Sequence, residues 1–283
     1  MIGWLGAISS AAAAGAAFVI GRRVYRRGMA QAEHAYGMMV SAAKTPARRF
    51  NPDEISTLPE IARRYFMHAV DPGTPLYSTV ALEMEGTFLL GSKGRFQTYK
   101  MAARQVLRPP DQFVWIPRMR SGRVTISGSD ALVGDKAWTR FWLLDLLPVA
   151  QADSSPDTIR SASFRAAVEG ALWLPTTLLP RNGVCWEQIG PDRARVTMGY
   201  FDPAIILELV LDHRGRVQEL VGQRWSNANE AKSFRMQPFG GTMGAERSYQ
   251  GLTIPVEIAV GNHYGTDDYL PFFQSKVTAA RYS

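Results

Sequence analysis

The stretch "STVALEMEGTFLL", residues 78–90, decides the fold class, because its side chains change character at every second residue. One face carries Val80, Leu82 and Met84, and the other carries Ala81, Glu83 and Glu85. A period of two is typical of a strand with one buried and one solvated face. We therefore expect this stretch to be a strand of an antiparallel sheet.

Further runs of the same kind follow along the chain and are separated by turn residues. They are "RFQTYKMAARQVL", "QFVWIPRMRSG", "KAWTRFWLLDLLP", "RARVTMGYF", "AIILELVLDHRGRVQELVGQRW", "GAERSYQGLTIPVEIAVGNHYG" and "FFQSKVTAARY". Asp212 to Gly215 lie between two alternating runs, as a hairpin turn does. The pattern predicts a mainly antiparallel β (α+β) fold of about ten to twelve strands, arranged as a barrel, a sandwich or, as we favour, a curved sheet or half-barrel.

Two helices interrupt or precede these strands. Thr57 and Glu60 have capping-box spacing, and apolar residues then recur at helical spacing until Asp71-Pro72-Gly73. The segment 154–175 begins with Ser, Pro and Asp and presents a face of small residues, with Arg165 and Glu169 placed to pair. We expect this second helix to cover the open face of the curved sheet.

The N-terminal segment is predicted to be a membrane anchor. Residues 2–21 carry no charge and would span about 30 Å as a helix, one hydrocarbon thickness. The arginines follow this segment, whereas a signal peptide carries its positive charge in front, so a retained anchor is favoured over a cleaved peptide. Its many small residues permit close helix packing, so an anchor that self-associates is an alternative. The expected membrane-proximal residues are Arg22, Arg23, Arg26 and Arg27.

This interpretation divides the chain into an anchor (1–27), a juxtamembrane helix and linker (28–53) and a β-rich half-barrel (54–283). The positive-inside rule then predicts a single-pass protein of the bacterial inner membrane with a cytoplasmic body, and a periplasmic body is the alternative.

The charge and cysteine content exclude two other classes of protein. The net charge is +7, but residues 1–50 hold seven Lys/Arg against one acid, and residues 51–283 hold 25 against 24. Because the body is nearly neutral, we expect no nucleic-acid partner. Cys185 is the single cysteine, so no intramolecular disulfide can form, and its apolar surroundings predict a buried, inert thiol.

Residues that would carry chemistry are sparse. The four histidines, His34, His68, His213 and His263, lack the short spacings of metal ligands, so we expect no metal site. The chain has no phosphate-binding loop, dinucleotide fingerprint or nucleophile elbow. We therefore name no cofactor and no catalytic residue and expect a binding protein, with an unrecognised hydrolase or isomerase as an alternative.

The body contains six tryptophans, which are Trp115, Trp138, Trp142, Trp173, Trp186 and Trp225. They belong either to a large filled core or to a concave apolar cavity with a few polar groups. A filled core predicts a tethered protein-interaction module, whereas a cavity predicts an apolar or amphiphilic ligand whose acidic head meets arginine. The candidate ligand-binding residues are Arg104, Trp115, Arg140, Trp142, Trp173, Arg224 and Trp225.

Several blocks of the body, taken together, carry a family resemblance. The blocks are "LPEIARRYFMHAV", "QVLRPPDQFVW", "WLPTTLLP", "RWSN", "PFGG" and "GLTIP", in this order. Residues 58–283 resemble an uncharacterised bacterial domain-of-unknown-function family, which implies no activity and no catalytic residue. The pattern is also similar, at the level of the fold, to the half-barrel with a plugging helix of lipoprotein-localisation factors. That resemblance implies a lipid-like ligand.

Overall fold

The computed structural model describes residues 2–44 and 46–283, with side chains of the first helix described from Gly15 onward. The helical elements are α1 (Ile2–Ala42), η1 (Pro52–Ile55), α2 (Glu60–Ala69), α3 (Pro156–Trp173), η2 (Pro175–Leu178) and η3 (Pro180–Asn182). The strands are β1 (Val80–Ser92), β2 (Arg95–Arg108), β3 (Gln112–Ser121), β4 (Val124–Val133), β5 (Lys136–Leu143), β6 (Leu147–Ala152), β7 (Val184–Gln188), β8 (Arg193–Met198), β9 (Ile205–Leu211), β10 (Val217–Ser226), β11 (Arg235–Met243), β12 (Glu246–Tyr249), β13 (Leu252–Pro255), β14 (Glu257–Asn262) and β15 (Leu270–Tyr282).

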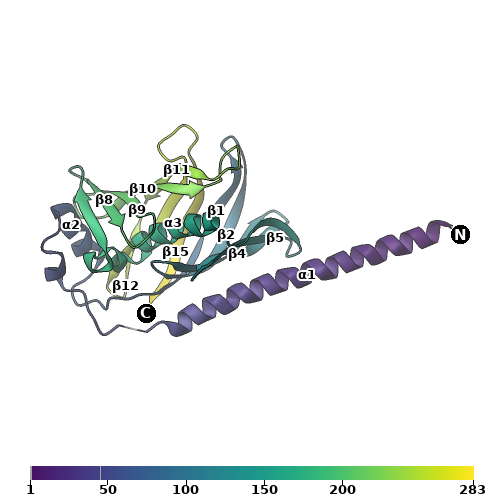
Figure 1. The fold of residues 1–283 in the computed structure, drawn as a ribbon, viewed down its shortest axis with the longest axis horizontal. Helices are drawn as coiled ribbons and strands as arrows, with labels where there is room; N and C mark the ends of the chain where they lie inside the picture. Colours follow the sequence, from purple (N-terminus) through teal and green to yellow (C-terminus); the bar gives the residue numbers. More distant parts are fainter. Residues whose placement is uncertain (1, 45) are drawn as a thin grey trace.

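Thirteen of these strands form one curved antiparallel sheet, in the order β6-β5-β4-β3-β2-β1-β15-β14-β11-β10-β9-β8-β7. The sheet does not close, because β6 and β7 are its two edges, and Figure 1 shows its concave face wrapping around α3. β12 and β13 pair separately. The expectation of a curved antiparallel sheet is confirmed, and the hairpin around Asp212 joins β9 to β10 as expected.

The expected number of strands was too low, because several strands lack alternation. β4 is buried on both faces for most of its length, and β6 is exposed along nearly all of its length. β12 and β13 each have only four residues. A strand that is uniformly buried, uniformly exposed or very short has no period of two that a sequence can reveal.

Glycine permits the close approach of neighbouring strands where the sheet curves. A Cβ atom on Gly86 of β1 would lie 2.0 Å from the carbonyl oxygen of Gln274, and one on Gly241 of β11 would lie 2.0 Å from that of Ala259. Any larger residue at these positions would push the paired strands apart. Gly241 lies in the interior of β11.

α3 fills much of the concave side, as predicted. Ser155 caps the helix, and its side chain and that of Thr158 bond each other's backbone N–H groups in a capping box. The helix packs against β10, β4, β5 and β2. It ends at Trp173, which is fully buried and donates its Nε1–H to the Pro255 carbonyl at 3.2 Å.

α2 begins later than its sequence predicts. The helix starts at Glu60 with Pro59 as its N-cap, and no side-chain cap is present, so the expected Thr57–Glu60 capping box is wrong. The short helix η1 and the turn after it, which place Thr57 outside the helix, account for the difference. The expected apolar stripe is correct, and its Tyr65 and Phe66 rings pack on Trp186 at 5.3 and 5.5 Å.

α1 runs along the convex face of the sheet (Figure 1). Its stripe of Gly28, Ala32 and Met39 is buried. Ala32 and Met39 belong to a cluster with Val106, Val114, Ile116, Ala131 and Trp138 of β2 to β5. The part expected to be juxtamembrane is thus packed against the body.

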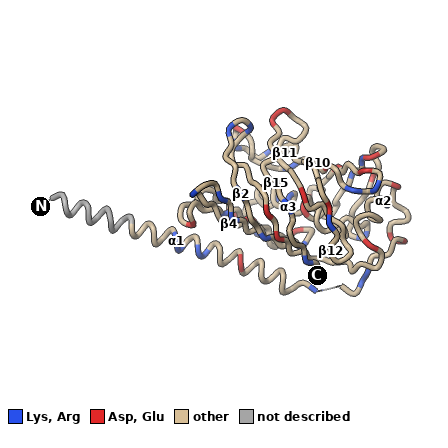
Figure 2. Tube along the Cα trace, turned by 180° about the vertical axis from the view of Figure 1, so that it is seen from behind, with Lys and Arg blue, Asp and Glu red and all other residues tan. Residues whose placement is uncertain are grey.

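The arginines after the apolar segment lie where α1 first meets the body (Figure 2). Arg22 donates to the Asp145 carbonyl at 3.2 Å and lies 3.7 Å from the Asp145 carboxylate, while Arg23, Arg26 and Arg27 are exposed. Among the described residues, no helix has the length and apolar character needed to cross a membrane. Most side chains of the expected anchor, residues 2–21, lie outside the described residues.

Candidate functional site

A cavity of about 650 Å³ lies between α3 and the concave face of the sheet. Its wall is mainly apolar, and inward positions of β1, β3, β5 and β15 place four aromatic rings side by side. Trp115 lies 6.0 Å from Phe88, 6.1 Å from Phe141 and 5.9 Å from Phe273, measured between ring centroids. Phe164 of α3 and Phe239 of β11, 5.7 Å apart, form the opposite wall.

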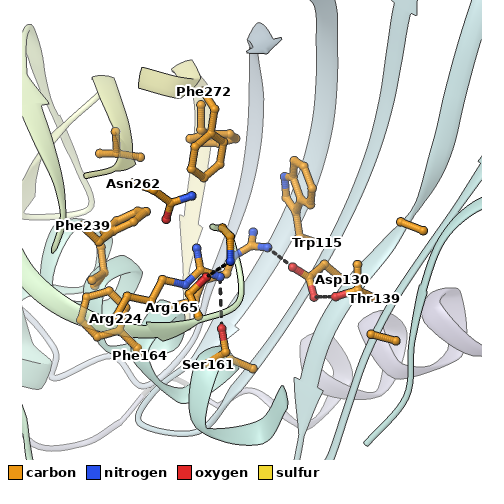
Figure 3. Close-up of a pocket in the computed structure, with 18 of the residues that line it drawn as sticks. Trp115, Asp130, Thr139, Ser161, Phe164, Arg165, Arg224, Phe239, Asn262 and Phe272 are labelled. Carbon is orange, nitrogen blue, oxygen red and sulfur yellow. Dashed lines mark hydrogen bonds and ion pairs between the residues drawn. The ribbon is translucent and has the colours of Figure 1, made fainter. Parts of the chain in front are cut away.

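Three charged side chains form a closed cluster in this cavity (Figure 3). Arg165 of α3 contacts Asp130 of β4 at 2.6 Å and Glu169, one turn along the helix, at 2.7 Å. The second oxygen of Asp130 accepts from Thr139 at 2.9 Å, and the second oxygen of Glu169 accepts from Gln105. Every carboxylate oxygen therefore has at least one donor, as in a structural cluster.

The pKa values of the cluster reflect its burial. Burial raises the pKa of Glu169, against the opposing effect of Arg165. Burial lowers the pKa of Arg165, but the carboxylates of Glu169 and Asp130 outweigh burial and raise it. The Arg165 guanidinium also lies 4.6 Å from the Phe113 ring and 4.9 Å from the Trp115 ring, so it is held on all sides.

Arg224 of β10 lines the same cavity but belongs to no ion pair among the described residues. One of its terminal nitrogens lies 3.4 Å from the Ser161 hydroxyl, and its guanidinium lies 5.5 Å from the Phe239 ring. Burial, followed by the nearby charge of Arg165, lowers the pKa of Arg224 to about 10. The side chain remains a cation at neutral pH.

The structure separates the sequence-predicted site residues into three places. Trp115, Trp173 and Arg224 line the cavity. Trp225 points away from it, donates to Asp157 at 2.7 Å and borders a separate groove with Tyr200.

The remaining three candidates lie on the convex face, against α1. Arg104 pairs with Glu33, and its guanidinium lies 4.9 Å from the Tyr36 ring. Arg140 donates to Gln31 at 2.8 Å. Trp142 meets the Tyr25 ring edge-on at 5.4 Å. The structure therefore does not bring these residues together with the cavity.

Sequence reasoning missed Asp130, which lines the cavity, and Gln105, which donates to Glu169, and it treated Arg165 and Glu169 only as a helix pair. An ion pair on a helix whose face consists of small residues indicates a buried charged cluster, because such a face is expected to be buried. Cys185 was expected to be buried, but it is exposed on the edge strand β7. Within the described part of the chain, no group of three or more His, Cys, Asp or Glu side chains is placed to hold a metal ion.

The chain belongs to a family of unknown function, DUF6544, which matches residues 48–275. The resemblance to an uncharacterised family is thereby confirmed. No curated protein matches the chain.

Two solved structures are similar to it, each at 10% sequence identity. A putative outer membrane lipoprotein-sorting protein domain from Vibrio parahaemolyticus covers 79% of this chain and 91% of its own, with a TM-score of 0.39. A LolA superfamily protein from Nitrosomonas europaea covers 79% and 90%, with a TM-score of 0.34.

Proposed function

We propose that this protein binds an apolar or amphiphilic, lipid-like ligand in the cavity between α3 and the sheet. The observation that carries the proposal is the cavity of about 650 Å³, lined mostly by apolar side chains, many of them aromatic, with a minority of polar and charged groups. Small-molecule sites have this form, with volumes of about 300–1,000 Å³. A pure interaction module needs no such space, because its concave face would be filled.

The energetics favour a ligand with a hydrocarbon chain. Each methylene transferred from water to an apolar wall contributes about 0.8 kcal/mol. Aromatic rings such as Trp115 and Phe273 form a wall that is not specific for one chain length. The open edge at β6 gives the cavity a side that no further strand of the sheet covers.

Binding of the neutral fluorescent probe N-phenyl-1-naphthylamine to the full chain tests this proposal. Ala152 of β6 lines the cavity and pairs with Thr139, so Ala152→Trp places a bicyclic ring inside. Ala102 of β2 is exposed, two residues from the outward-facing Arg104, so Ala102→Trp is the matched control on the convex face. We expect the first substitution to weaken probe binding about tenfold, equivalent to about 1.4 kcal/mol. The control should bind as the native protein does.

Equal probe binding by the two variants would contradict a site in the cavity. Mass spectrometry of the purified native protein adds an independent readout. A co-purifying lipid that Ala152→Trp loses and Ala102→Trp retains supports the proposal.

A further inference from the structure

The cavity contains one cation that no carboxylate contacts. Four charged side chains line it, and three of them, Asp130, Arg165 and Glu169, contact one another directly and together carry one negative charge in excess. The fourth, Arg224, has no carboxylate within ion-pair distance among the described residues, so its charge is balanced only beyond contact distance. A guanidinium in an apolar cavity without a contacting acceptor is costly, so its position favours a direct partner.

The polar atoms left unpaired on the wall point to the chemistry of that partner. Nε of Arg224 is buried and has no acceptor in the described part of the protein, and the same holds for Nε1 of Trp115. Both groups are donors only. Figure 3 shows Arg165 lying between the two side chains, and Asn262 directed toward the same space. A group rich in acceptor oxygens matches the donor-only guanidinium of Arg224, whereas a hydrocarbon end does not.

The surroundings of Arg224 favour a ligand that is anionic at one end only. The Ser161 hydroxyl lies 3.4 Å from a terminal nitrogen of Arg224, and the rings of Phe164 and Phe239 lie beside the guanidinium. A second anion in the cavity would meet Asp130 and Glu169, which carry negative charge already. The rest of the wall is mostly apolar and suits a chain.

We propose that Arg224 is the head-group site of the cavity and binds the anionic oxygens, carboxylate or phosphate, of a single-headed amphiphile whose chain packs on the aromatic wall. This inference rests on the proposed function, since it needs a ligand in the cavity. Hydrogen bonds between ions are stronger than neutral ones, so the head group contributes both affinity and orientation.

Competition against N-phenyl-1-naphthylamine with three ligands of equal chain length tests the assignment in the full chain. Dodecanoate and dodecyl phosphate carry the two anionic heads, and dodecanol carries none. The variants are Arg224→Met, which removes the charge and keeps the stem, and Arg224→Lys, which keeps the charge. The matched control is Arg160→Met, because Arg160 lies on the other groove with its guanidinium 4.3 Å from the Trp225 ring.

We expect the native protein and Arg160→Met to bind at least one anionic ligand about tenfold or more tightly than dodecanol. The tighter of the two identifies the head group as carboxylate or phosphate. Arg224→Met should lose this preference and keep its dodecanol affinity within about twofold, and Arg224→Lys should retain part of it. If Arg224→Met does not fold, Arg224→Gln gives the same comparison.

Two results would overturn the assignment. One is equal affinity of the native protein for dodecanol and both anions, which leaves ligand binding in the cavity intact. The other is an anion preference that survives in Arg224→Met. Failure of the neutral probe and all three ligands to bind would instead overturn the proposed function itself.

Discussion

Replacing Arg165 by methionine tests whether the charged cluster holds α3 against the sheet. Arg165 is the cation that both Asp130 and Glu169 contact, at 2.6 and 2.7 Å. The side chains of the three residues are only 17%, 22% and 10% exposed, respectively. Arg165→Met would keep the apolar stem and leave two buried carboxylates with only Thr139 and Gln105 as donors.

The expected cost is large because the two carboxylates stay buried. Breaking a buried pair by removing one partner costs about 3–5 kcal/mol. For a domain of this size, each kcal/mol lowers the melting temperature by about 2–4 °C, so we expect a decrease of about 6–20 °C at pH 8. Arg64→Met is the matched control, because Arg64 and Glu60 form an i,i+4 pair at 3.0 Å with Glu60 56% exposed. Its cost should stay within about 0.5 kcal/mol.

The cost should also depend on pH. Burial raises the pKa of Glu169 even in the native protein, and removal of the opposing Arg165 charge raises it further above its value in the unfolded chain. Groups with raised folded-state pKa values reduce stability as the pH rises through those values. The deficit of Arg165→Met should therefore be larger at pH 8 than at pH 5, and Glu169→Gln added to it should recover part of the loss at pH 8.

Urea denaturation of the native protein and the variants at both pH values supplies the measurement. A deficit below about 1 kcal/mol at pH 8 would show that the cluster is solvated like a surface pair, contrary to our reasoning. A large deficit that is independent of pH would place the effect in packing rather than in charge.

Two further substitutions test the convex and concave sides of the sheet. Gly28→Leu should release α1 from the sheet, because even a Cβ atom at this position would lie 2.5 Å from the Trp142 ring. Limited proteolysis should then cleave α1 near Gly28. The control Gly37→Leu has open space at its Cβ, so its α1 should remain protected. Gly86→Val should cost more than about 3 kcal/mol in urea denaturation, because its Cβ would lie 2.0 Å from the Gln274 carbonyl oxygen, and an unchanged midpoint would contradict the close approach of β1 and β15.

The parts of the fold that could be predicted are those with a strong local signal. Alternation in β1, the turn at Asp212 and the Ser155 cap of α3 are all set by neighbouring residues. The docking of α1 could not be predicted, because its contact stripe includes Gly28 and Ala32. Small residues pack closely and yet give a weak hydrophobic pattern.

The division of the candidate site between two faces has a similar cause. Trp138, Arg140 and Trp142 occupy every second position of β5, and this spacing alone predicts that they share one face of the sheet. Which face borders the cavity depends on what covers each side of the sheet, and a single strand carries no such information. β4 and β5 lie between α1 and α3, so apolar and aromatic side chains occupy both of their faces.

The packing of α1 against the sheet also fixes a direction in space. A flexible linker would let the body rotate freely about its point of attachment. α1 instead continues without a break from Ile2 to Ala42, about 60 Å, and its second half is held by Ala32, Met39 and the Arg104–Glu33 ion pair. An attachment at the N-terminal end of this helix would therefore fix the orientation of the whole body. The cavity and its β6 edge would then face one constant side of the attachment point.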